Sequence, residues 1–120
     1  MFSGVDRRLP PLRRPRNLLG SSINYKGRSM DRSEFEAALA RDGYEAVARS
    51  MQPNTVNPDH THDFDARVMV LEGAITIGRS SGSHTYGPGE WCEVAAGELH
   101  SEQVGPVGVS YVAGRRNGAA

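Results

Sequence analysis

The stretch His60-Thr-His62-Asp-Phe-Asp-Ala-Arg-Val-Met-Val-Leu-Glu-Gly73 decides how the rest of the chain is interpreted. Side chains in an extended strand alternate between its two faces, so His60 and His62 are expected to share one face. Imidazole nitrogens bind zinc, iron, nickel and copper well, and two on one face can reach the same ion. The spacing therefore predicts part of a metal site.

The residues after His62 indicate short strands joined by turns. Residues 68–71 are rich in β-branched side chains, Glu72-Gly73 has turn chemistry, and residues 74–77 resume the strand pattern, which predicts a hairpin. Glycine- and proline-rich turns separate the remaining segments. The other strands that we expect are residues 44–51, 84–86, 91–94, 99–104 and 107–113. The chain is therefore predicted to be mostly β.

The order of histidines and glycines along these segments resembles the two motifs of the cupin superfamily. His60, His62 and Gly73 match the first motif, and Gly89, Gly97 and His100 match the second. The resemblance covers residues 44–114. It implies a small antiparallel β-barrel or jelly roll with a pocket inside, in which His60, His62 and His100 converge on a metal ion.

The chain departs from the family pattern at a metal-binding position. Ala66 stands at the family's glutamate, Ala95 at its proline and Val104 at its asparagine. Glu102 follows His100 by two residues and shares its face, so we expect it as the fourth ligand or as a partner of one. Asp65 is a lower-ranked alternative, because strand alternation turns it away from the face of Ala66.

Five further side chains are candidates for lining the pocket: Arg67, Met69, Tyr86, Trp91 and Tyr111. Binding sites are mostly apolar with a few polar groups, which suits the aromatic residues and the methionine. More often, however, such residues are simply part of the core. Arg67 could face a ligand that carries a carboxylate, or could lie on the solvent side of its strand.

The first 29 residues differ from the rest in charge. They hold seven basic side chains against Asp6 alone, a net charge of +6, whereas the remainder carries −6. Their prolines and low apolar content predict disorder. This segment could be an arm that binds RNA or another anion, an inert tail, or an extension upstream of a natural start at Met30.

A short helix is expected over residues 30–43, leading into the barrel. Ser33 and Glu36 have the spacing of a capping box, and Gly43 is suited to a left-handed helix end. The narrow apolar stripe of this segment suggests that it lies on the outside of the barrel or on a partner subunit. Residues 115–120 are expected to form a flexible tail.

Length and composition limit the class of protein. A chain of 120 residues forms one domain at most, and its formal charge of zero gives no general attraction to nucleic acid or membrane. No apolar run is long enough for a membrane helix. The single cysteine, Cys92, excludes an intramolecular disulfide and fits a reducing compartment, so we expect a cytoplasmic protein.

Three functional hypotheses follow. The first is a barrel that binds Fe, Zn, Ni, Mn or Cu and, if the family resemblance extends to activity, catalyses oxygenase, isomerase or lyase chemistry on a small molecule. The second is a barrel that binds or senses a small molecule without turnover. The third is a structural barrel with vestigial histidines. The resemblance also implies a homodimer formed through open sheet edges.

Overall fold

The computed structural model describes residues 30–117, as one helix and six strands. The elements are α1 (Arg32–Arg41), β1 (Glu45–Met51), β2 (Val56–His60), β3 (Phe64–Arg79), β4 (Gly82–Tyr86), β5 (Trp91–Val94) and β6 (His100–Asn117). No helix among these residues is long and apolar enough to cross a membrane. The expectations for residues 1–29 and 118–120 lie outside the described part of the chain.

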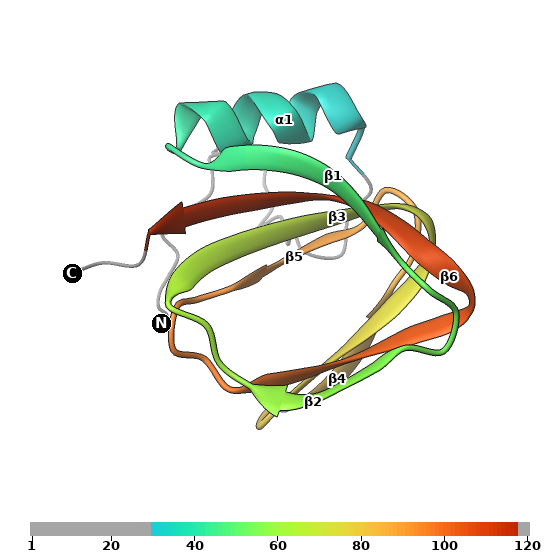
Figure 1. Cartoon of the computed structure of the whole chain (residues 1–120). Helices are drawn as coiled ribbons and strands as arrows, with labels where there is room; N and C mark the ends of the chain where they lie inside the picture. Colours follow the sequence, from blue (N-terminus) through green and yellow to red (C-terminus); the bar gives the residue numbers. More distant parts are fainter. Residues whose placement is uncertain (1–29, 118–120) are drawn as a thin grey trace.

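The strands form two layers because β3 and β6 are long enough to take part in both (Figure 1). In the layer next to α1, the second half of β6 pairs with β1, and the first half of β3 pairs with β5. In the other layer, the first half of β6 pairs with β2, and the second half of β3 pairs with β4. All pairs are antiparallel, which confirms the predicted mostly β jelly roll with a short helix.

Two glycines bend the long strands where they pass between the layers. Gly73 has φ +80° and Gly108 has φ +85°, a region that side chains disfavour, and a Cβ at Gly73 would collide with the carbonyl of Gly108. The predicted hairpin at Glu72-Gly73 is therefore wrong, because the register shifts there while β3 continues. The strands predicted over 99–104 and 107–113 are likewise one strand, β6. It runs on to Asn117 and includes residues 115–117 of the expected tail.

Helix α1 is defined by its caps. Asp31 is the N-cap: its carboxylate accepts from the backbone N–H of Glu34 at 2.9 Å, and the Glu34 side chain accepts from the N–H of Asp31 at 3.2 Å. The capping box predicted at Ser33 and Glu36 is therefore wrong by two residues, although the spacing is the same. Gly43, with φ +83°, ends the helix as predicted.

The apolar core is divided by the layer of strands beneath α1. One cluster fills the interior between the layers and consists of Val70, Ile75, Ile77, Tyr86, Cys92, Val104 and Val109. The other lies between α1 and the outer face of its layer and consists of Phe35, Leu39, Tyr44, Met69, Trp91 and Val112. The predicted packing of the helix against the outside of the barrel is confirmed. Successive residues of β3, such as Met69 and Val70, therefore belong to different clusters.

Candidate metal site

Two strands bring the predicted histidines together at one end of the interior. His60 ends β2 and lies opposite His100, the first residue of β6, in the register of the two strands. Their ring centroids are 4.3 Å apart, and the His62 ring is 5.0 Å from that of His100. His62 follows the end of β2, so it does not share a strand with His60 as predicted. The three side chains nevertheless form one cluster.

Each of these histidines uses its Nδ1 atom in the same way. Nδ1 lies 2.8 Å from the Pro58 carbonyl in His60, 2.8 Å from the Phe64 carbonyl in His62 and 2.9 Å from the Glu98 carbonyl in His100. A carbonyl oxygen can only accept, so Nδ1 must carry the proton. In a neutral imidazole, Nε2 then keeps its lone pair, which is the arrangement that a metal-binding histidine needs.

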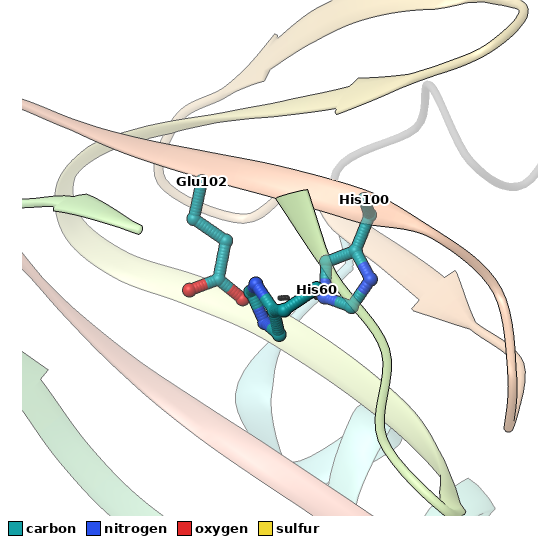
Figure 2. A group of neighbouring side chains, drawn as sticks. All are labelled: His60, His100 and Glu102. Atoms are coloured by element: carbon teal, nitrogen blue, oxygen red, sulfur yellow. Dashed lines mark ion pairs between the residues drawn. The ribbon is translucent and has the colours of Figure 1, made fainter. Parts of the chain in front are cut away.

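Glu102 completes a group of three converging ligand atoms. One ligand atom each from His60, His100 and Glu102 lies within 4.8 Å of the other two. Figure 2 shows the three side chains pointing toward one another from β2 and β6. The Nε2 atom of His100 is 3.6 Å from Oε2 of Glu102. Two imidazoles and one carboxylate are a ligand set suited to a divalent transition metal with open coordination positions.

His100 provides the strongest sign that the group is a binding site. Its side chain is 1% exposed, and its Nε2 atom has no hydrogen-bond partner among the described residues. A buried polar atom without a partner costs about 1–3 kcal/mol, so such an atom calls for an explanation. Coordination to a metal ion would satisfy the lone pair that the Glu98 carbonyl leaves on this nitrogen. The donor set therefore fits a divalent cation.

Asn57 holds the carboxylate of Glu102 in place. Its side-chain amide donates a 2.7 Å hydrogen bond to Oε1 of Glu102, which leaves Oε2 on the side of His100. Asn57 lies opposite Glu102 in the pairing of β2 with β6. The sequence did not identify this residue, because only the register between two distant strands shows that the side chains meet.

His62 lies at the edge of the group. Its ring stacks on Phe64, with centroids 4.1 Å apart and an interplanar angle of 3°. Burial lowers the pKa of His62, and the neighbouring His100 and His60 lower it further, while its hydrogen bond to the Phe64 carbonyl opposes these effects. A neutral ring with a free Nε2 lone pair is available as a further ligand, although its nitrogen is not one of the three that converge.

The carboxylate comes from a strand different from the one the family pattern uses. Ala66 lies on β3, two residues before Val68 and on the same face, which is the interior face. The family's glutamate position therefore faces inward as the resemblance implies, but it carries no ligand atom. Asp65 does not replace it: its carboxylate accepts from the backbone N–H of Ala96 and from Arg116, both at 2.9 Å. Glu102 on β6 supplies the carboxylate.

The predicted pocket residues are divided between the two faces. Tyr86 belongs to the interior cluster, and Tyr111 packs against it. Burial raises the pKa of Tyr111, and the charge of Glu102 raises it further. Met69 and Trp91 lie under α1, on the far side of the layer from the histidines. The structure therefore does not bring these two to the site.

Arg67 also lies on the helix side, within a network of charged and aromatic residues. This helix-side cluster consists of Asp42, Tyr44, Arg67, Glu93 and Arg116. The guanidinium of Arg67 donates to Asp42 at 2.8 Å, lies 3.5 Å from Glu93 and stands over the Tyr44 ring at 4.4 Å. Arg67 thus has a structural environment and does not face a ligand in the interior.

Comparison with solved structures agrees with this architecture, whereas no family model and no curated protein matches the chain. A protein of unknown function from Rhizobium leguminosarum bv. viciae has a TM-score of 0.58 and 20% identity, over 62% of this chain and 70% of that one. A sugar phosphate isomerase of the cupin superfamily from Silicibacter pomeroyi has a TM-score of 0.51 and 19% identity, over 62% and 51%.

Oxalate decarboxylase from Bacillus subtilis, a protein with Mn(II) centres, is also similar. Its TM-score is 0.52 with 19% identity, and the match covers 65% of this chain but 22% of the decarboxylase. This chain thus spans about half of the isomerase and a smaller part of the decarboxylase. At such identities the likeness concerns the fold. The chain has the double-stranded β-helix fold of the cupin superfamily.

Proposed function

We propose that this protein binds one divalent transition-metal ion through His60, His100 and Glu102 and presents it to a small molecule inside the barrel. The observation that carries the proposal is the buried Nε2 atom of His100, which makes no hydrogen bond within the described chain and converges with ligand atoms of His60 and Glu102. His62 is the candidate for a fourth ligand. The Mn(II) centres of the decarboxylase with the same fold support the proposal.

The protein groups around the site have distinct roles in this proposal. Backbone carbonyls hold the histidines with Nε2 free, and Asn57 orients Glu102. Tyr111 packs against the interior cluster, and its phenol, which is protonated at neutral pH like that of any tyrosine, can donate a hydrogen bond there. A bound metal would supply Lewis-acid polarisation of a ligand oxygen, and a redox-active metal would add electron transfer. Oxygenation, isomerisation and lyase chemistry can each use one of these.

Metal analysis of purified protein tests the proposal. We expect about one metal ion per chain in the wild type by plasma mass spectrometry after growth in metal-supplemented medium. His100→Ala should lose the ion, because the ligand atom that lacks any other partner is removed. His84→Ala is the control, since His84 is exposed and lies outside the converging group. A wild type that stays metal-free when Fe, Zn, Ni, Mn and Cu are each supplied would contradict the proposal.

A protein that binds metal need not catalyse a reaction. The second hypothesis, a barrel that binds or senses a small molecule without turnover, therefore needs a separate test. If the barrel senses a small molecule without converting it, candidate ligands should raise the melting temperature of the metal-bound protein while no product accumulates. Conversion of any of the same compounds by the metal-bound protein, lost in His100→Ala, would instead establish an enzyme.

A further inference from the structure

Arg79, the last residue of β3, is an arginine on the interior face of the barrel. It follows Ile75 and Ile77, which belong to the interior cluster, at the same two-residue spacing, and its side chain is 18% exposed. In the pairing of β3 with β6, Gly78 lies opposite Ser101. Strand β3 thus reaches Arg79 at the end of the barrel where β6 begins at His100.

The guanidinium of Arg79 anchors the turn that precedes β6. One nitrogen donates to Oε2 of Glu98 at 2.6 Å, and another donates to the backbone carbonyl of Glu93 at 2.6 Å. The second carboxylate oxygen of Glu98 accepts from the backbone N–H of Ala95 at 3.2 Å. Glu98 is thus held at both of its oxygens, and Arg79 ties it to the end of β5.

Glu98 is also the residue whose backbone carbonyl accepts from Nδ1 of His100, at 2.9 Å. Glu98 therefore connects the two residues, because its carboxylate binds Arg79 and its backbone carbonyl binds His100. This carbonyl decides which ring nitrogen of His100 carries the proton and so which nitrogen can bind a metal. A displaced turn would release that constraint.

We propose that Arg79 is a positioning residue for His100. By fixing Glu98 it keeps the proton on Nδ1 and directs the Nε2 lone pair toward His60 and Glu102. The inference rests on the proposed metal site for its functional meaning. Mutating a group that contacts a metal ligand directly typically costs about 10- to 100-fold in metal affinity. Arg79 acts one contact further out, through Glu98, so we expect an effect near the lower end of this range.

The chain offers a matched control for this arginine. Arg116 also donates to one carboxylate, that of Asp65 at 2.9 Å, and to one backbone carbonyl, that of Asp42 at 3.0 Å. It does so on the helix side, away from the histidines. Arg79→Met and Arg116→Met therefore remove similar contacts, and only the first should affect the metal site.

The experiment combines calorimetric titration with Co(II) and NMR of the imidazole nitrogens in the metal-free protein. We expect Arg79→Met to weaken Co(II) binding about 10-fold and to move part of the proton population of His100 from Nδ1 to Nε2. Arg116→Met should leave both quantities as in the wild type. Arg79→Lys, which keeps the charge but cannot bridge Glu98 and Glu93, should show the same changes to a smaller degree and remains informative if the methionine variant does not fold.

The outcomes separate this inference from the proposed function. If the wild type binds no Co(II), the proposed metal site fails, and the proton position on His100 still decides the role of Arg79. A His100 ring whose proton stays on Nδ1 in both Arg79 variants would overturn the inference even if metal binds. Equal losses of affinity in Arg79→Met and Arg116→Met would also overturn it, because they would indicate a general loss of stability.

Discussion

The helix-side cluster and the histidine cluster are both polar groups in a small barrel, but they differ in how their members are paired. In the helix-side cluster, the guanidinium of Arg67 lies against two carboxylates and the Tyr44 ring, and Arg116 lies over the same ring at 4.5 Å. The Nε atom of Arg67 makes no hydrogen bond within the described residues, but it lies 3.5 Å from the Glu93 carboxylate. In the histidine cluster, three imidazoles use Nδ1 on backbone carbonyls, and the buried Nε2 of His100 makes no hydrogen bond within residues 30–117 but lies 3.6 Å from the Glu102 carboxylate.

The difference suits the first cluster to a structural role and the second to the binding of a cation. Opposite charges placed face to face offset one another's desolvation, so the helix-side cluster can join α1 to the barrel without any further component. In the histidine cluster, neutral imidazoles carry no charge that would offset the desolvation of the Glu102 carboxylate. A cation between the imidazoles and the carboxylate would do so. The helix-side cluster therefore balances its own charges, whereas the histidine cluster places one carboxylate beside imidazole lone pairs, an arrangement that a cation would complete.

The largest expected effect comes from breaking the helix-side cluster. Arg67→Ala leaves Asp42 and Glu93 without their shared cation, and removing one partner of a buried ion pair costs about 3–5 kcal/mol. Urea denaturation should show this loss in the free energy of unfolding, while metal affinity per folded molecule stays unchanged. Arg41→Ala is the control, since its pair with Asp42 is exposed and should contribute about 0–1 kcal/mol.

The next largest effect is expected when the carboxylate of the histidine cluster is removed, and it concerns the free energy of metal binding. Glu102→Gln keeps the shape of the side chain and removes the anionic ligand, and we expect metal affinity to fall about 100-fold or more, or about 2.7 kcal/mol. Asp65→Asn, the alternative that the sequence suggested, should stay within about twofold, because Asp65 binds Arg116 and Ala96 instead. Calorimetric titration of both variants decides between the two carboxylates, and the reverse ranking would contradict the assignment.

The smallest effect concerns tyrosine titration, which probes each region separately. Burial raises the pKa of Tyr44 in the helix-side cluster to about 12, and it raises that of Tyr86 in the interior to about 12. Both exceed the ordinary value of 10.0, so the folded state favours the neutral phenol. This contribution to stability is complete below pH 10 and is lost as the pH rises through the folded pKa.

Phenolate absorbance during an alkaline titration measures these values. Tyr44→Phe and Tyr86→Phe should each remove one late-titrating group, and the stability of each variant should fall less steeply between pH 10 and 12 than that of the wild type. A tyrosine that ionises near pH 10 in the folded protein would show that its region is more open to water than the structure indicates.

Much of the histidine cluster could be predicted from residue spacing and the family resemblance, because side chains two apart on a strand share a face. This rule placed Glu102 beside His100 without knowledge of the fold. It could not identify Asn57 or Arg79, whose importance depends on which residues lie opposite them on other strands. Strand register is a long-range property, and the sequence pattern around either residue does not encode it locally.

Arg67 and Met69, the pocket candidates on β3, lie on the helix side for a reason that the sequence does not show. Alternation separates Ala66, Val68 and Val70 from Arg67 and Met69, but both sets are buried or nearly so. One face looks into the barrel and the other is covered by α1, so hydrophobicity does not show which is which. The bend at Gly73 was similarly ambiguous, since a glycine with positive φ ends a hairpin turn as readily as it bends a continuing strand.

The position of a bound metal ion tests the central claim most directly. We expect a crystal of the Mn(II)- or Zn(II)-treated protein, measured at the absorption edge of the metal, to show one anomalous peak per chain. The peak should lie within bonding distance of Nε2 of His60, Nε2 of His100 and a carboxylate oxygen of Glu102. A peak elsewhere in the chain, or an empty histidine cluster at saturating metal, would contradict the account.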